Sequence, residues 1–177
     1  MAWGKKKREQ EEQAAIIEAN RAADGTVALL LPGGDVTDVV GESHYQEALE
    51  TICGGKTEEA VDKACWAFLQ PEPDNPFDRN AVAVYINGLK VGYLSRDLAV
   101  DMSVATTHLW NTMQARCVAR AQIRGGWRRE YPRKDGAVDV DEGHYGVILG
   151  LADWEHLEGQ QSVTVLTAEQ LAAGPED

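Results

Sequence analysis

The alternation of apolar and polar positions predicts a chain made mostly of short strands. Several short apolar runs end at glycine, proline or polar residues, as strands joined by tight turns do. The predicted strands are 27–31, 38–41, 64–69, 81–86, 90–94, 114–123 and 145–151. The Asn87-Gly88 dipeptide predicts a hairpin turn. The run at 114–123 alternates most regularly, so one face should meet a core, with Cys117, Ala119, Ala121 and Ile123 pointing inward.

Helical spacing is found in a few further segments. Residues 5–23 contain good helix formers without glycine or proline, but only one strongly apolar pair, so we expect a solvated helix. Apolar residues three and four positions apart predict helices at 45–52 and 97–111. A weak strand at 163–166 and a weak helix at 168–173 follow near the C-terminus.

The chain of 177 residues is long enough for one domain with an extension at each end. Short strands separated by turns, with one helix in each half, predict a mainly β (α+β) fold built as a small β-barrel. Residues 125–143 are expected to form a long connection. The expected divisions are a charged helical extension at 1–25, the barrel domain at 26–152 and an acidic C-terminal tail at 153–177.

The net charge of −12, taken by itself, argues against nucleic acid as a partner. The charge is unevenly distributed, however. Residues 65–134 contain ten basic and six acidic residues, whereas residues 135–177 contain ten acidic residues and no lysine or arginine. Exposed charges are screened over about 8 Å, so the basic middle of the chain can act separately from its acidic flanks. Nucleic acid is therefore not excluded.

Other features exclude several classes of protein. No apolar run approaches the ~18 residues of a membrane-spanning helix. The basic N-terminal cluster is followed by Glu and Gln instead of the apolar segment of a secretory signal. Three widely spaced cysteines do not indicate a disulfide framework. We therefore expect a protein of the reducing cytoplasm with no membrane partner, and core thiols at Cys53, Cys65 and Cys117.

The most informative part of the chain is 71–99, which begins with a polar turn. The sequence Asn75-Pro76-Phe77-Asp78 predicts a rigid turn that lifts an aromatic ring and a carboxylate off the barrel. Either Asp78 or Asn80 can close an Asx-turn before the next strand. The alternative is an elaborate turn with no binding role, in which Phe77 folds into the core.

This part of the chain resembles the HIRAN domain family. The resemblance rests on N-P-F-D-x-N-A-V-A-V at 75–84 and V-G-Y-L-S-R-x-x-A at 91–99. A weaker block at 39–45 is similar to the family's first conserved block, and the whole resemblance covers about 36–151. It implies a six-stranded OB- or SH3-like barrel with two helices. The domain binds the free 3′ end of single-stranded DNA in helicase-like fork remodellers, and it also occurs in small bacterial proteins.

The resemblance also implies roles for individual residues. Phe77 matches an aromatic residue that stacks on a terminal base, an interaction worth about 1–3 kcal/mol. Asp78 matches a carboxylate that accepts a hydrogen bond from the 3′-hydroxyl and would repel a 3′-phosphate. Arg96 matches a basic residue that contacts phosphate.

Three positions depart from the family's pattern. Tyr93 replaces a histidine that contacts phosphate, although a phenol can still donate a hydrogen bond. His44 replaces a stacking tyrosine and offers a smaller ring. Ser43 replaces an arginine, which removes one phosphate contact. Tyr45, beside His44, belongs to the same block and is kept as a candidate binding residue.

A basic stretch forms a second candidate surface. Arg116, Arg120 and Arg124 lie on one face of the predicted strand, and Trp127 and Tyr131 interleave with further arginines after it. Cations among aromatic rings are the usual platform for single-stranded nucleic acid. Alternatively, the strand is solvated and its arginines pair with the acidic tail.

The sequence therefore predicts a binding module and not an enzyme. It contains no P-loop or G-x-S-x-G signature and no zinc-ligand spacing, so no catalytic residue, metal or cofactor is expected. The predicted function is capture of single-stranded DNA ends with a free 3′-hydroxyl, in DNA repair or replication-fork processing. The candidate nucleic-acid-binding residues are His44, Tyr45, Phe77, Asp78, Tyr93, Arg96, Arg116, Arg120, Arg124 and Trp127.

Two other functions fit the sequence less well. In the first, the barrel is a protein-interaction module that recruits a nuclease or helicase partner through the N-terminal helix or the acidic tail. In the second, Glu72, Asp74 and Asp78 form the metal cluster of a nuclease, although no E-x-K or D-x-K partner lies nearby.

Overall fold

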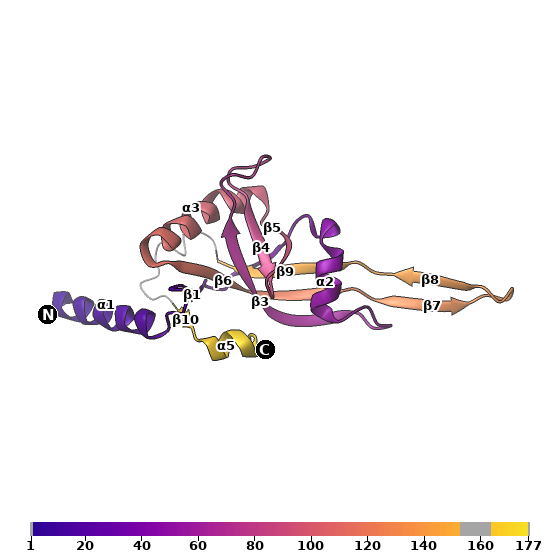
Figure 1. The fold of residues 1–177 in the computed structure, drawn as a ribbon, viewed down its shortest axis with the longest axis horizontal. Coiled ribbons are helices and arrows are strands. Elements are labelled where there is room, and N and C mark those ends of the chain that lie inside the picture. The colour runs from indigo at the N-terminus through magenta and orange to yellow at the C-terminus, as the bar shows by residue number, and fades with distance from the viewer. Residues whose placement is uncertain (1, 153–163, 177) are drawn as a thin grey trace.

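The computed structural model describes residues 2–152 and 164–176 (Figure 1). Its helices are α1 (Ala2–Ala19), the 3₁₀ turn η1 (Glu42–His44), α2 (Gln46–Cys53), α3 (Arg96–Met113) and α5 (Ala168–Ala173). Its strands are β1 (Val27–Leu30), β2 (Asp35–Asp38), β3 (Val61–Pro71), β4 (Val82–Ile86), β5 (Leu89–Tyr93), β6 (Ala115–Gly125), β7 (Arg128–Pro132), β8 (Val138–Glu142), β9 (Tyr145–Leu151) and β10 (Thr164–Leu166).

The long strand β6 lies at the centre of a curled sheet. One edge of β6 pairs with β3, which continues to β4 and then β5. The other edge pairs in parallel with β1 near the start of β6, and antiparallel with β9 along its second half. β9 continues to β2, and β1 continues to β10. The mainly β prediction is confirmed.

The curled sheet brings its two ends together at a single point. Val40, just after β2, forms an isolated bridge with Tyr93 at the end of β5, with N–H···O distances of 2.8 and 2.9 Å. The implied six-stranded closed barrel is not confirmed, because this contact is one bridge pair and not a ladder. The sheet is better described as a curled half-barrel.

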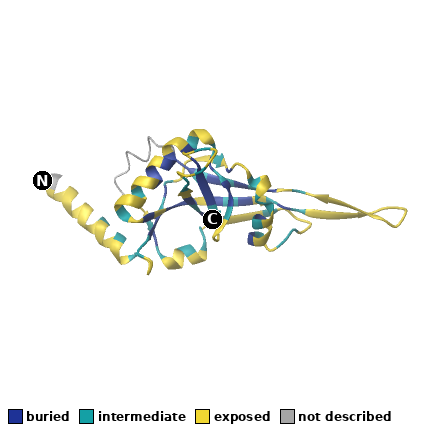
Figure 2. Cartoon of the chain, turned by 45° about the horizontal axis from the view of Figure 1, so that its top comes forward, coloured by how far each residue is buried: buried dark blue, intermediate teal, exposed yellow. Residues whose placement is uncertain are grey.

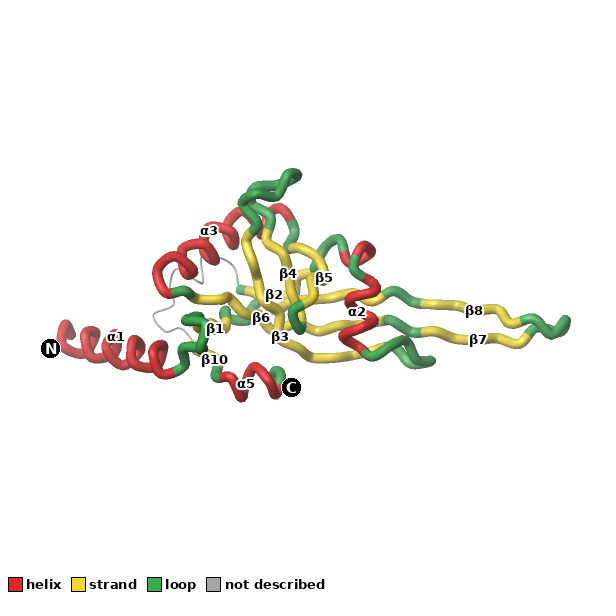
Figure 3. Tube along the Cα trace, in the orientation of Figure 1, coloured by secondary structure: helices red, strands yellow, loops and turns green. Residues whose placement is uncertain are grey.

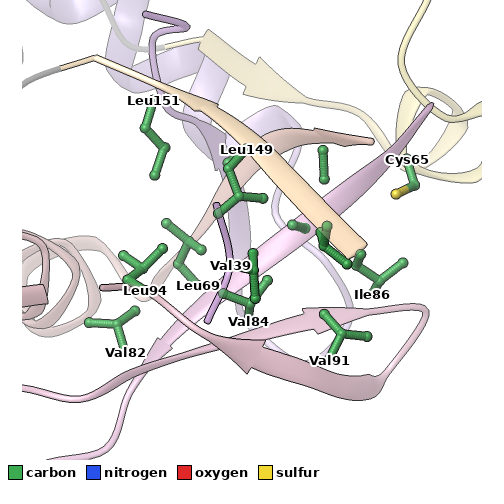
Figure 4. Packing of buried hydrophobic residues seen from close by; sticks show 14 of the residues in the cluster. Val39, Cys65, Leu69, Val82, Val84, Ile86, Val91, Leu94, Leu149 and Leu151 are labelled. Carbon is green, nitrogen blue, oxygen red and sulfur yellow. The ribbon is translucent and has the colours of Figure 1, made fainter. Parts of the chain in front are cut away.

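The core lies inside the curl, where strands and helices bury alternate apolar side chains (Figures 2 and 4). The inward face of β6 is the predicted one, with Cys117, Ala119, Ala121 and Ile123 buried. Helix α2 contributes Leu49 and Ile52, and α3 contributes Ala99 and Met102. Further core side chains come from the remaining strands and from residues directly after them, including Val39, Leu69, Val82, Val84, Ile86, Val91, Leu94 and Leu149.

Two predictions about local structure were wrong. The strand expected at 38–41 is formed by Asp35–Asp38 instead, because pairing with β9 extends upstream of the apolar pair at 39–40. The long connection expected at 125–143 contains the β7–β8 hairpin, which projects from the body as an arm (Figure 3). Every residue of β7 and β8 is exposed, so this arm lacks the apolar alternation that marks a half-buried strand.

The other predicted elements are present, most of them with shifted ends. The N-terminal helix ends at Ala19, and the strands predicted at 64–69 and 114–123 are longer, as β3 and β6. The hairpin turn between β4 and β5 has positive φ at both Asn87 and Gly88 (50° and 78°), as a type I′ turn requires. Among the described residues, no helix has both the length and the apolar composition needed to cross a membrane.

Candidate nucleic-acid interface

The turn between β3 and β4 presents an aromatic ring to solvent. The Asn75 Oδ1 atom accepts hydrogen bonds from the backbone N–H groups of Phe77 (3.0 Å) and Asp78 (3.2 Å). The Asp78 carboxylate accepts from the Asn80 N–H (2.8 Å), which forms the predicted Asx-turn. The Phe77 side chain is 89% exposed, so the alternative in which it folds into the core is wrong.

A polar cluster fastens this turn to the sheet. Lys90 Nζ donates to Glu72 Oε1 (2.5 Å) and to the Tyr93 hydroxyl (3.0 Å), and Tyr93 in turn donates to Glu72 Oε2 (3.0 Å). Asn75 Nδ2 donates to the same Glu72 oxygen (3.0 Å). Partial burial opposes ionisation of Glu72, but hydrogen bonds from Lys90, Asn75 and Tyr93 outweigh it and lower the pKa of Glu72. The turn and Tyr93 therefore belong to one hydrogen-bonded unit.

A β-bulge places Lys90 and Tyr93 on the same side of the sheet. Residues three apart on a regular strand point to opposite faces. Here Tyr85 pairs with Lys90 while Val84 pairs with Gly92, so β5 has one extra residue at this point. A Cβ atom on Gly92 would lie 2.4 Å from Val39 Cγ1 and 2.7 Å from the Val40 carbonyl oxygen. Glycine is thus required where β5 meets the segment after β2.

The aromatic block upstream of α2 lies against this cluster. The Tyr45 ring is 6.4 Å from the Tyr93 ring, centroid to centroid, at 58°. Partial burial is the main cause that raises the pKa of Tyr45, and the neighbouring Tyr93 adds to it. His44 is exposed at the end of η1, and Arg96 is exposed as the first residue of α3. Within the described residues, neither side chain forms a hydrogen bond or ion pair.

Five of the predicted binding residues therefore gather around one end of the sheet, and a sixth, His44, precedes one of them in the chain. Hydrogen bonds link the turn to Tyr93 through Glu72, ring contact adds Tyr45, and the Leu94 N–H to Val82 carbonyl bond (3.0 Å) sets the start of α3 beside the end of the turn. We call this group the turn site: His44, Tyr45, Phe77, Asp78, Tyr93 and Arg96. Since the Tyr93 hydroxyl donates to Glu72, a phosphate contact from Tyr93 requires Glu72 to release it.

The other predicted residues lie elsewhere. Arg116, Arg120 and Arg124 are exposed on the outer face of β6, away from the core. Arg124 donates to the Gln122 side chain at 2.5 and 3.0 Å. Trp127 lies at the base of the β7–β8 arm, bridged to Thr57. The ten predicted residues thus occupy three places, not one surface.

Sequence reasoning missed two aromatic residues on the outer face. Trp66 and Phe68 of β3 pair with Arg120 and Val118 of β6, so they point to the same side as the arginines. The Arg116 guanidinium lies 4.2 Å from the Phe68 ring centroid, and that of Arg120 lies 5.4 Å from the Trp66 centroid. Their spacing of two residues within the run at 64–69 indicates that they share one face of the strand. Because the whole run is apolar, however, the sequence does not show which face points outward.

The chemistry for a nuclease is not assembled at the turn. Both Glu72 oxygens are held by Lys90, Tyr93 and Asn75, and Asp74 is exposed. Over the described ranges 2–152 and 164–176, no three His, Cys, Asp or Glu side chains could hold a metal ion together. Burial raises the pKa of the Cys65 thiol to about 11 and that of the Cys117 thiol to about 12, so both are protonated thiols of the core.

The curled sheet and its exposed, hydrogen-bonded turn define a small β-rich domain. The sequence profile of the HIRAN domain matches residues 38–127, which is half of the chain, and this protein belongs to the HIRAN domain family. A search of curated proteins gives no match. Among solved structures, the chain is similar to the HIRAN domain of human HLTF, with 20% identity and a TM-score of 0.35, over 80% of this chain and 88% of that one.

Proposed function

We propose that this protein captures the free 3′ end of single-stranded DNA at the turn site and acts in DNA repair or replication-fork processing. HIRAN domains are in general DNA-binding modules, and nothing in the domain itself is catalytic. The observation that carries the proposal is Phe77, an aromatic ring left 89% exposed on a turn whose backbone is held by Asn75. Ordering the turn before binding lowers the entropy cost of stacking a base on that ring.

The other turn-site residues supply polar contacts around this ring. Asp78 uses one carboxylate oxygen for the Asn80 N–H, which leaves the other as an acceptor for a 3′-hydroxyl. A 3′-phosphate at the same place would bring two negative groups together, so the free hydroxyl is preferred. Arg96 contributes an exposed cation for the adjacent phosphate, Tyr45 offers a flat surface beside Tyr93, and the exposed His44 precedes Tyr45 in the chain.

The direct test compares labelled oligonucleotides that end in a 3′-hydroxyl or a 3′-phosphate by fluorescence polarisation at low salt. We expect tighter binding of the hydroxyl end. Equal binding of the two ends, or none, would overturn end capture.

Two matched pairs of variants sharpen this test. Asp78→Asn should reduce the preference for the hydroxyl end, whereas Asp74→Asn, an exposed carboxylate in the same turn, should leave it unchanged. Phe77→Ala should weaken binding about fivefold or more. Val36→Ala, which shortens another well-exposed apolar side chain (69% exposed), should have no effect.

A second candidate function, a protein-interaction module that recruits a nuclease or helicase, is favoured by the projecting arm. Three large apolar side chains of β7 and β8 are exposed to solvent: Tyr131 (49% exposed), Val138 (53%) and Val140 (48%). On this view, replacing Val138 and Val140 by Ser would abolish capture of the partner, and Phe77→Ala would not. Loss of capture with Phe77→Ala but not with the arm variant would reject it.

A further inference from the structure

The outer face of the sheet carries a second array of aromatic rings and cations, separate from the turn site. Trp66 and Phe68 alternate along β3, so their rings are spaced by about 7 Å. On the neighbouring strand, Arg116 stacks on Phe68 and Arg120 on Trp66. Single-stranded nucleic acid presents bases that can stack on such rings and phosphates at regular intervals that can contact the guanidinium groups beside them.

The C-terminal segment covers this array. Strand β10 pairs with the free edge of β1 and places Leu166 in a small apolar cluster with Trp66 and Val118. Leu171 of α5 packs against the same cluster. The Trp66 Nε1–H donates to the Gln170 carbonyl (2.9 Å), and Arg120 donates to the Glu176 carbonyl (3.0 Å). Trp66 is only 8% exposed as a result, although it points away from the main core.

Three features of this C-terminal segment favour its replacement by a negatively charged ligand. Helix α5 has six residues and no buried residue of its own, well below the length of about 12 at which isolated helices become marginally stable. The chain beyond α5 meets Arg120 through a neutral carbonyl oxygen, that of Glu176. Phosphate oxygens are stronger acceptors for a guanidinium than a carbonyl is. Residues 164–177 also contain three acidic and no basic residues, so phosphate would repel the displaced segment.

We propose that Trp66, Phe68, Arg116 and Arg120 form a second platform, which binds the body of a single-stranded nucleic acid, and that residues 164–176 are its displaceable cover. This platform does not require a 3′-hydroxyl, so it goes beyond end capture at the turn site. Occupation of the platform releases α5 from Trp66 and Glu176 from Arg120.

Hydrogen exchange on the full-length chain tests the displacement. The probe is an oligothymidylate with a 3′-phosphate, which is the end that the turn site rejects. At saturating probe, amides of α5 and β10 should exchange about tenfold faster, while amides of the β4–β5 hairpin remain protected. Unchanged or increased protection of residues 164–176 at saturation would overturn the proposal.

Point variants in the full-length chain test the platform itself. Arg116→Ala and Arg120→Ala should each weaken binding of the same probe about fivefold and lower its salt dependence. The matched control is Arg129→Ala, which removes another exposed arginine that stacks on a tryptophan, 4.8 Å from the Trp127 ring. Equal losses of affinity in all three variants would mean that binding depends only on net charge, and would overturn the proposed platform.

A third set of measurements separates the platform from the turn site and from a peptide site. Phe77→Ala should leave binding of the 3′-phosphate probe unchanged, whereas it weakens binding of the hydroxyl-ended oligonucleotide about fivefold or more if end capture is correct. Leu171→Ser should loosen the cover and raise affinity for the probe about threefold or more. A synthetic peptide of residues 164–177 should compete with the probe. Binding of that peptide without any binding of the probe would make the face a peptide site and overturn the proposal.

Discussion

The turn site and the outer face both combine aromatic rings with cations, but they are held in opposite ways. At the turn, hydrogen bonds between residues close in sequence support Phe77 and leave it exposed. On the outer face, Trp66 is buried by a segment about a hundred residues later in the chain. Local turn chemistry can thus build an open site in advance, whereas a site made by sheet pairing can be closed by another part of the same chain.

The largest loss of stability is expected at Gly92, where the turn site depends on a tertiary contact. Gly92→Ala adds a Cβ atom 2.4 Å from Val39 Cγ1 and 2.7 Å from the Val40 carbonyl, so the Val40–Tyr93 bridge must open. We expect a loss of about 3 kcal/mol in the free energy of unfolding, measured by chemical denaturation. Gly146→Ala is the control, because a Cβ atom at that position would meet no neighbouring residue within 4 Å. Similar losses in both variants would contradict this explanation.

A smaller loss is expected from the turn's internal support. Asn75→Ala removes the acceptor for two backbone N–H groups and one bond to Glu72, which should cost about 2 kcal/mol. It should also weaken end binding, because Phe77 is no longer held in place. Denaturation and polarisation measure the two effects. Asn80→Ala, in the same turn, should change neither, and an equal effect there would refute the role of the Asn75 side chain.

The Glu72–Lys90 pair should make stability depend on pH. The pKa of Glu72 is lower in the folded protein than in the unfolded chain, so its contribution is present above the ordinary carboxyl pKa and is lost as pH falls through the folded pKa. Near pH 6 the free energy of unfolding of the wild type should exceed that of Glu72→Gln by about 1 kcal/mol, and the difference should vanish as pH falls through the folded pKa of Glu72. A difference that persists in acid would show that packing, not charge, is responsible.

The smallest loss of stability of the whole protein is expected from a change on the outer face. Thr167→Ala removes the capping box of α5, in which Thr167 accepts from the Gln170 N–H (3.1 Å) and Gln170 accepts in return (2.9 Å). The change should cost at most about 1 kcal/mol and leave the rest of the sheet intact. Hydrogen exchange should rise in α5 alone among the described elements. Thr107→Ala, exposed on α3, is the control; a rise throughout the sheet would mean that the cover is part of the core.

Much of the fold follows from local sequence. The face of β6 that meets the core was predicted because small apolar residues alternate with arginines along the strand. Burial stabilises only the apolar face. An Asx-turn at Asp78 or Asn80 and a hairpin turn at Asn87-Gly88 were predicted because their geometry depends on a few adjacent residues. The β7–β8 arm was missed because neither of its faces is buried, so no apolar period marks it.

Local signals in the sequence were enough to establish the family, the alternation of the central strand and the polar turn at 75–78, but they left open whether Phe77 is exposed. Only the tertiary structure decided which of the candidate residues share a surface. It placed Lys90 beside Tyr93 through a bulge, drew Tyr45 against them, and covered Trp66 with the C-terminal segment. The reason is physical: turn geometry depends on neighbouring residues, whereas strand pairing and docking bring together residues whose contact has no local signal in the chain.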